Sequence, residues 1–379
     1  MKRIHVGDFR IGREEKDAIN EVLDSGRISE GPKVREFEKN FGEYIGTKYT
    51  IALNSGTSSL IAGLLALKYH KNLNVRSNTK VITTPLTFIA TSNAIVISGF
   101  EPVYVDVDPE TFVITPENIK ACLENSDASE YSIILPVHLM GYPVEMDKIN
   151  KIAKDYGMVT FEDAAQAHGT VYKGKKVGSW GNLADFSFYI AHNIQAGEMG
   201  AIVTDDSEIS RLIRKIKAHG RICDCPVCMR AEGKCPRISR GNEDFDPRFT
   251  HDLIGYNFKT MEFQAVFGIL QLKKADWIME KRLENVRYLN ENLSKFSDVL
   301  QLPKYDKNIS YLAYPLVVKN PERISRNMLS FELEKKGVET RPIFGCIPTQ
   351  QPAYDYLKKD YKGKLPIADH IGKNGFYIG

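Results

Sequence analysis

The segment Met158–Gly169, with the sequence MVTFEDAAQAHG, joins a short apolar run to a group of polar residues. Its first part, Met158–Phe161, has the length and composition of a buried strand, and Asp163 comes two residues later. Open α/β sheets bind ligands at loops beyond the carboxyl ends of their strands. We therefore expect Asp163 at a ligand-binding edge, although an Asp after a strand also commonly caps a helix. His168 is equally compatible with a catalytic and with a structural role.

The same alternation of strand-like and helix-like segments continues on both sides of this stretch. Short runs rich in Val and Ile are separated by helical patterns, which favours the α/β class with a mostly parallel sheet covered on both faces. The strands expected are Lys80–Thr84, Glu101–Val107, Tyr131–Val137, Met158–Phe161, Asp185–Tyr189 and Gly200–Thr204. The helices expected are Thr57–Tyr69, Thr87–Ile97 and Met146–Tyr156.

The length of 379 residues exceeds that of most single-core domains, so we expect a large and a small domain. We predict a large domain over residues 1–260, a long connecting helix over 261–298 and a small C-terminal α+β domain over 299–379. In the small domain, Ala313–Val318 is typical of a strand and Ile324–Lys336 of a helix.

The charge and hydropathy of the chain exclude several classes of partner. Its net charge is only +3 and it has no long basic block, so we expect neither nucleic acid nor an anionic membrane as its main partner. The first residues lack the apolar core of a secretory signal, and the apolar runs are too short to span a bilayer. We predict a cytoplasmic protein.

Two further segments carry candidate binding residues. In Asn54–Leu60, NSGTSSL, small residues follow a strand and begin a helix, where backbone N–H groups and the helix dipole bind phosphate. A simple helix cap by Ser55 or Thr57 explains the same pattern. In the second segment, Ser187 has a hydroxyl group suited to phosphate, and His192 follows it by five residues.

The loop over residues 220–251 interrupts the alternation and holds four of the six cysteines. A loop of this length in a compact enzyme is usually functional or disordered, and four thiols argue against plain disorder. In a cytosolic protein such crowding indicates metal binding or redox chemistry more than disulfides. The candidate ligands are Cys223, Cys225, Cys228 and Cys235.

Taken together, these motifs resemble the DegT/DnrJ/EryC1/StrS sugar aminotransferase family. The resemblance covers the chain from about Gly7 to its end. It is carried by NSGTSSL at 54–60, TTPLTFIATSNAI at 83–95, VDVDPETF at 105–112, PVHLMGYP at 136–143, FEDAAQAHG at 161–169, GSWGNLADFSFY at 178–189, GAIVTDD at 200–206 and GYNFKTMEFQA at 255–265.

The resemblance implies the aspartate-aminotransferase (type I) fold and a homodimer that acts on nucleotide-linked keto-sugars with pyridoxal phosphate (PLP) or pyridoxamine phosphate (PMP). It also implies roles for individual residues. Gly56, Thr57 and Ser187 would hold the cofactor phosphate, Phe88 would stack on the ring, Asp163 would pair with the pyridine nitrogen, Gln166 would lie near the ring hydroxyl, and Asn257 would reach the phosphate of the neighbouring subunit.

His192 departs from the pattern of the family's aminotransferases, which place the Schiff-base lysine at this position. Histidine cannot form a stable Schiff base, but it is a good general base near neutral pH. The same change occurs in the family's 3-dehydratases, which make 3-deoxy sugars such as ascarylose and colitose. We therefore expect a C-3 dehydratase of a nucleotidyl 4-keto-6-deoxy-hexose. The alternatives are a non-catalytic, metal-stabilised binding protein and a sugar aminotransferase.

The cysteine loop resembles that of the ascarylose-type dehydrase, which binds a [2Fe–2S] cluster. The relative's cluster is held by a Cys-x-Cys pair, a later cysteine of the same loop and a cysteine earlier in the chain. Cys223, Cys225 and Cys235 resemble the loop part. The earlier cysteine would fall at Ala165, so Cys228 would replace it as the fourth ligand from within the loop. We expect an iron–sulfur cluster fed by a separate reductase or ferredoxin, with structural zinc as the alternative. A colitose-type route needs no cluster and uses glutamate instead. Relatives normally continue beyond Gly379, so truncation and an early end both remain open.

Overall fold

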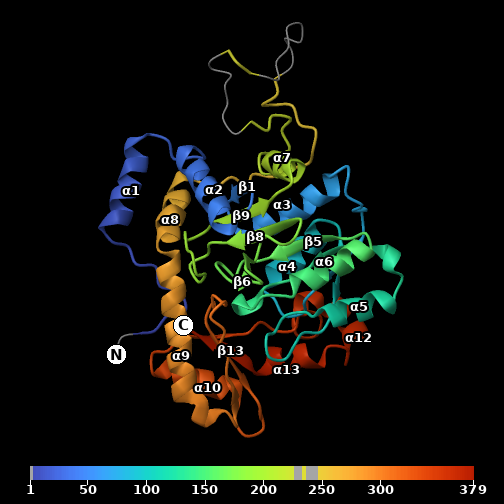
Figure 1. Ribbon diagram of the computed structural model, residues 1–379, viewed down its shortest axis with the longest axis vertical. Helices are drawn as coiled ribbons and strands as arrows, with labels where there is room; N and C mark the ends of the chain where they lie inside the picture. Colours follow the sequence, from blue (N-terminus) through green and yellow to red (C-terminus); the bar gives the residue numbers. More distant parts are fainter. Residues whose placement is uncertain (1–2, 226–232, 236–245) are drawn as a thin grey trace.

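The computed structural model describes residues 3–225, 233–235 and 246–379 (Figure 1). A seven-stranded sheet, with strand order β1-β9-β8-β5-β4-β2-β3, forms its centre. The pairs from β8 to β3 are parallel, whereas β9 is antiparallel to β1 and β8, so the predicted mostly parallel sheet is confirmed. The strands are β1 (Tyr49–Leu53), β2 (Lys80–Thr83), β3 (Glu101–Tyr104), β4 (Tyr131–Leu135), β5 (Val159–Asp163), β8 (Leu183–Ser187) and β9 (Gly200–Thr204).

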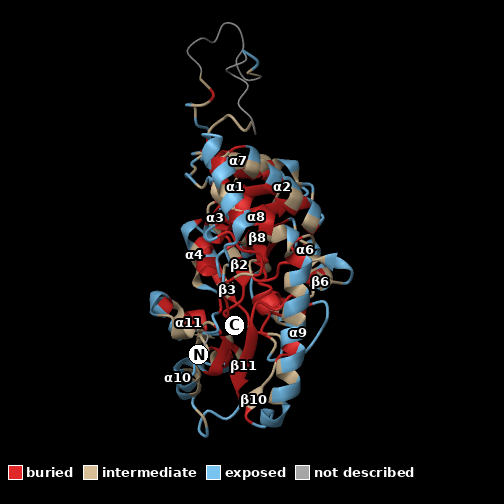
Figure 2. Cartoon of the chain, turned by 90° about the vertical axis from the view of Figure 1, so that its left-hand side faces the viewer, coloured by how far each residue is buried: buried red, intermediate tan, exposed pale blue. Residues whose placement is uncertain are grey.

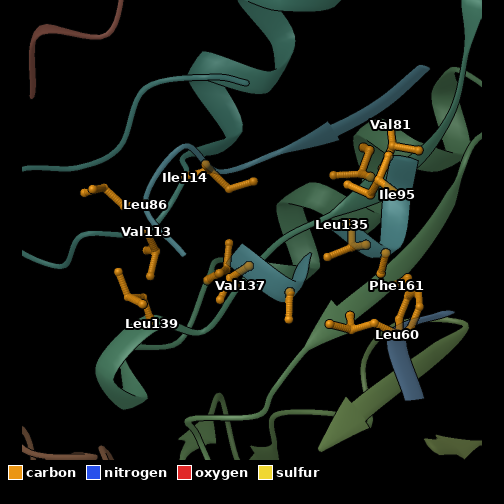
Figure 3. Close-up of a cluster of buried hydrophobic side chains, with 14 of the residues drawn as sticks. Leu60, Val81, Leu86, Ile95, Val113, Ile114, Leu135, Val137, Leu139 and Phe161 are labelled. Atoms are coloured by element: carbon orange, nitrogen blue, oxygen red, sulfur yellow. The ribbon is translucent and has the colours of Figure 1, made fainter. Parts of the chain in front are cut away.

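Helix α3 (Gly56–Tyr69) covers one face of this sheet and is buried over most of its length. Its apolar residues are not confined to one side, which is typical of a helix enclosed by protein. Gly63 of α3 lies against Phe161 and Leu183, because a Cβ added there would approach their side chains to 2.5 and 3.2 Å. Figure 3 shows part of the core that α3, α4 (Ile89–Ile97) and the parallel strands form together.

The opposite face packs against α2 (Pro32–Ile45) and α8 (Glu262–Lys273) through a second apolar cluster. Phe186 of β8 meets Phe41 of α2 at a ring distance of 5.0 Å. The alternation of side chains along β8 therefore directs Phe186 toward α2, whereas Leu183 points toward α3. Asp185 and Ser187, which share the parity of Leu183, belong to the α3 side.

The C-terminal part forms a smaller antiparallel sheet of order β10-β11-β13-β12. The α/β type I architecture with a smaller C-terminal α+β unit is thus confirmed, while the exact domain limits stay predictions. The elements are β10 (Leu300–Gln301), β11 (Tyr314–Val318), β12 (Thr340–Pro342), β13 (Gly375–Ile378), α10 (Arg326–Lys335), α11 (Ile347–Gln350), α12 (Lys358–Tyr361) and α13 (Pro366–Asn374).

The prediction of one connecting helix over 261–298 is wrong. The chain forms α8 and then α9 (Ala275–Leu293), separated at Lys274, whose φ of −98° and ψ of 0° leave the helical region. Lys274 Nζ reaches Glu15 at 2.8 Å and Glu14 at 3.3 Å, which ties the break to α1. Figure 2 shows that α9 is largely exposed, and only Ala275 and Val286 in it are buried.

The remaining elements complete the layers around the large sheet. In the described part of the chain, no helix is long and apolar enough to cross a membrane. The further elements are α1 (Arg13–Asp24), α5 (Pro116–Glu124), α6 (Met146–Asp155), α7 (Ser207–Ile216) and the short strands β6 (Val171–Tyr172) and β7 (Lys175–Lys176).

Candidate active site

The start of α3 and the end of β8 meet at Gly56 and Ser187. A Cβ added to Gly56 would lie 2.7 Å from Ser187 Cβ, so only glycine fits without displacement. Ser55 caps the helix, since its Oγ accepts the Ser58 N–H at 3.1 Å. The exposed Thr57 stands in the first turn. Ser55 therefore acts as the helix cap. The first turn also presents backbone N–H groups and the Thr57 hydroxyl, which suit an anion such as phosphate.

Asp163 ends β5 and is buried. Its Oδ2 accepts a hydrogen bond from Thr91 Oγ1 at 2.8 Å, and its Oδ1 accepts one from the Ala165 N–H at 3.2 Å. Burial raises the pKa of Asp163, and these two hydrogen bonds oppose that effect. Within the described residues Asp163 forms no ion pair with a basic side chain. A protonated pyridine nitrogen is the kind of cation that such a buried carboxylate lacks.

Phe88 and Gln166 lie on the two segments that supply Asp163 and its partner Thr91: Phe88 is three residues before Thr91, and Gln166 is three residues after Asp163. Phe88 precedes α4, is 58% exposed and contacts Phe344 edge-on at a ring distance of 5.9 Å. Its exposed ring is available for stacking. The Oε1 atom of the buried Gln166 accepts the Met140 N–H at 2.9 Å, which fixes the orientation of the amide.

His192 lies in the turn after β8, and its backbone N–H donates to the Tyr189 carbonyl at 2.8 Å. Its Nδ1 atom is buried and has no hydrogen-bond partner among the described residues. Burial, and then the positive charge of Arg282, lower the pKa of His192 to about 3. Without a cofactor the imidazole is therefore neutral at physiological pH.

His168 is fully buried between aromatic rings. Its ring lies 5.1 Å from Phe188, 5.3 Å from Phe186 and 6.2 Å from His192. Burial is the main cause that lowers the pKa of His168 well below its ordinary value. Neither ring nitrogen has a hydrogen-bond partner in the part of the chain that the structure describes. The packing supports a structural role for this histidine.

Asn257 is exposed, and a backbone hydrogen bond of the next residue brings it close to the start of α3. The neighbouring Phe258 carbonyl accepts the Asn54 N–H at 2.9 Å, and Asn257 itself forms a bridge with Ala218. The structure thus places Asn257 next to the segment that carries Gly56 in the same chain.

A model of one protein family matches residues 10–378 and is described as the DegT/DnrJ/EryC1/StrS aminotransferase family. The chain belongs to this family.

Among curated relatives, the lipopolysaccharide biosynthesis protein RfbH of Salmonella typhimurium is 31% identical over 377 residues, covering 97% of this chain and 85% of that protein. A GDP-perosamine synthase of Escherichia coli O157:H7 is also 31% identical, over 379 residues, covering 100% of this chain and 93% of that protein. Among solved structures, the E. coli GDP-4-keto-6-deoxy-D-mannose-3-dehydratase with bound hydrated PLP has a TM-score of 0.84 and 27% identity, covering 100% of this chain and 95% of that one.

Membership of the DegT/DnrJ/EryC1/StrS family makes the protein a PLP-dependent enzyme of nucleotide-sugar modification. The names of the relatives include both dehydratases and a synthase, so they do not decide the branch. The residues fit the cofactor on structural grounds, because the backbone at Gly56 packs directly against Ser187 at the start of α3, and Asp163 is a buried carboxylate that pairs with no basic side chain among the described residues.

The predicted metal ligands lie partly beyond what the structure describes. Cys228 falls outside the described residues, whereas Cys223, Cys225 and Cys235 are half-buried and form no disulfide there. In the described ranges, no three His, Cys, Asp or Glu side chains gather into a group suited to a metal ion. The Cys223 N–H donates to the Pro247 carbonyl at 3.3 Å. Metal binding by this loop therefore stays a prediction.

Three residues of the site were not predicted from the sequence. Thr91 holds Asp163 across 72 positions of the chain, and Arg282 reaches the surroundings of His192 from α9. No local pattern signals either contact. Asp185 stands in the same motif as Ser187, two residues before it, so the period of two along a strand was the signal available for it.

Proposed function

We propose that the protein is a PMP/PLP-dependent C-3 dehydratase of a nucleotidyl 4-keto-6-deoxy-hexose. The observation that carries this proposal is His192, whose buried Nδ1 atom has no hydrogen-bond partner among the described residues, at the position where the family's aminotransferases have lysine. A histidine accepts and returns protons without forming a stable Schiff base. An aminotransferase would need the amine that this position lacks.

Each residue of the site contributes one physical function to this reaction. Gly56, Thr57 and Ser187 would hold the cofactor phosphate, and the ionised Asp163 would keep the pyridine nitrogen protonated. When bound, the cofactor ring supplies the electron sink that loss of a 3-hydroxyl group requires. His192 would take up the proton that is removed next to the ring, a role that usually contributes about 10²–10⁴-fold in rate.

The completion of the reaction is proposed to be reductive. Its support is the thiol-rich loop, in which Cys223, Cys225 and Cys235 are half-buried on a segment that leaves α7. With Cys228 they would hold an iron–sulfur cluster that passes electrons from a separate reductase. The glutamate-dependent route of the colitose type, with zinc or no metal in the loop, is the alternative. Iron, sulfide and zinc analysis of protein purified without oxygen distinguishes the two.

A homodimer is part of the same proposal, with Asn257 of one subunit serving the phosphate of the other. Its support is a set of large apolar side chains exposed around Asn257, which a second copy of the chain would cover. They are Phe249, Ile254, Tyr256 and Met261, with exposed fractions of 72, 76, 36 and 38%.

The test of the dehydratase is to incubate the protein and PMP with CDP-, GDP-, dTDP- and UDP-linked 4-keto-6-deoxy-hexoses, with and without a reductant. Proton NMR should show loss of the 3-hydroxyl group from one of them, and His192→Asn should abolish this loss. A 4-amino sugar as the product would favour the aminotransferase. Cofactor binding without conversion of any of these sugars would favour a non-catalytic binding protein.

A further inference from the structure

Asp185 is a second buried carboxyl group next to Asp163. The two residues are Cα partners in the parallel pair of β5 and β8, and the Ala164 N–H donates to the Asp185 carbonyl at 3.0 Å. Side chains of directly paired residues project from the same face of a sheet. Both carboxyl groups therefore lie on the α3 side, and Ser187 follows Asp185 by two residues on that side.

The surroundings of Asp185 provide no partner for a negative charge. The residue is 0% exposed, and neither Oδ1 nor Oδ2 has a hydrogen-bond partner in the described part of the chain. A lone buried carboxylate is strongly unfavourable, so a group of this kind is neutral or paired with a cation. Asp163 differs, because Thr91 and Ala165 donate hydrogen bonds to it.

The groups that surround the two carboxyls leave this difference unchanged: Asp163 has hydrogen-bond donors and Asp185 has none from the residues around it. Asp163 is the titratable neighbour from β5, the partner of Asp185 on β9 is the apolar Ile202, and α3 contributes the apolar Leu60 and Gly63 to this face. The basic group that acts on Asp163 is His138, whose ring pairs with Glu162 at 3.0 Å.

Without a cation beside them, two adjacent buried carboxyl groups do not both ionise, because like charges disfavour each other. The donors at Asp163 stabilise its ionised form, so the proton is expected on Asp185. In agreement, burial and then the nearby Asp163 raise the pKa of Asp185 well above its ordinary value, and the residue's own backbone N–H, the smallest of the three causes, opposes them.

We propose that Asp185 is a positioning residue that holds one proton beside Asp163 and loses it when a positively charged ring nitrogen binds there. The inference rests on the proposed cofactor site. In the step, the O–H bond of Asp185 breaks and the proton passes to the solvent buffer, with no change in oxidation state. The pair then carries two negative charges against the ring, which strengthens the hold of Asp163 on the protonated nitrogen.

The test compares the full-length wild-type protein, freed of cofactor, with Asp185→Asn by calorimetric titration with PMP. Titrations at pH 7 in two buffers of different ionisation enthalpy give the number of protons released. Because the ring and its phosphate contribute equally in both proteins, the wild type should release about one proton per site more than the variant. The exposed Asp360→Asn serves as the control and should match the wild type.

A second readout covers the case in which Asp185→Asn does not fold. The infrared spectrum of the wild type should contain a protonated-carboxyl band at pH 7 that disappears when PMP is added. A band that persists, or equal proton release in the wild type and Asp185→Asn, overturns the inference while leaving the proposed function intact. A wild type that binds no PMP overturns the proposed cofactor site and this inference together.

Discussion

Replacing Gly56 with alanine tests the contact between the start of α3 and the end of β8. The new Cβ would lie 2.7 Å from Ser187 Cβ and 3.0 Å from Ser187 Oγ. Carbon atoms in favourable contact are about 3.5–4.0 Å apart, so the two segments must separate by roughly 1 Å. Overpacking of this kind typically costs about 1–3 kcal/mol in the free energy of unfolding. In an open helix, the same change would stabilise by up to about 1 kcal/mol.

The net expectation is therefore a loss of stability, together with weaker cofactor binding, because both separated segments hold the phosphate in the proposed function. Denaturant unfolding of the cofactor-free protein measures the first effect, and fluorescence titration with PLP the second. Ser187→Gly removes the atoms that clash, so Gly56→Ala should cost less in the Ser187→Gly background. Thr57→Ala, at the exposed neighbouring position, is the control and should leave stability nearly unchanged. A Gly56→Ala protein that is as stable as the wild type, or additive effects in the double variant, would refute this reasoning.

The remaining predictions concern the base, the support of Asp163, acid stability and the cysteine loop. His192→Lys should form an internal aldimine that absorbs in the visible region and should gain some transamination, whereas an unchanged spectrum would show that position 192 does not face the cofactor. Thr91→Val removes a hydrogen-bond donor from the buried Asp163. A hydrogen bond to a charged group contributes about 1.5 kcal/mol, so the affinity for PMP should fall by about tenfold. Thr349→Val, far along the chain, is the control. His168 and His192 have pKa values below that of the unfolded chain, about 6.5, so the cofactor-free protein should lose stability as the pH falls from 6.5 toward 3. His192→Asn should flatten that loss by up to about 1.4 kcal/mol per pH unit, and an identical pH profile would argue against a buried neutral imidazole. Cys223→Ser and Cys225→Ser should each abolish net formation of the 3-deoxy sugar but spare proton exchange next to the ring, and unchanged turnover would remove the redox role.

Most strands of the large sheet were predictable because they are short apolar runs, but some of their ends were not: β8 is Leu183–Ser187 instead of Asp185–Tyr189, and β3 ends at Tyr104 instead of Val107. β9, for example, spans the predicted Gly200–Thr204, where a Val- and Ile-rich run lies between Gly200 and two aspartates. The break at Lys274 was not predictable, because neither glycine nor proline marks it and the apolar pattern continues across it. At the break, Lys274 pairs with Glu15 of α1, a contact between residues far apart in the sequence.

The site was predictable where a residue follows directly from its place in a motif. The family motifs indicated Gly56, Asp163, Ser187 and His192, and the structure brings Gly56 and Ser187 into contact. The hydrogen bond from Thr91 and the charge of Arg282 depend on tertiary packing, which a single sequence does not encode locally. The orphaned carboxyl group of Asp185 likewise required the register between β5 and β8.

The central claim is that His192 occupies the place of the family's Schiff-base lysine and leaves the cofactor without a covalent link. Borohydride reduction of the PLP-loaded protein, followed by peptide mass spectrometry, tests it directly. We expect that all of the cofactor is released on denaturation and that no peptide carries a pyridoxyl-lysine. A stoichiometric pyridoxyl adduct on any lysine of the wild-type chain would contradict it.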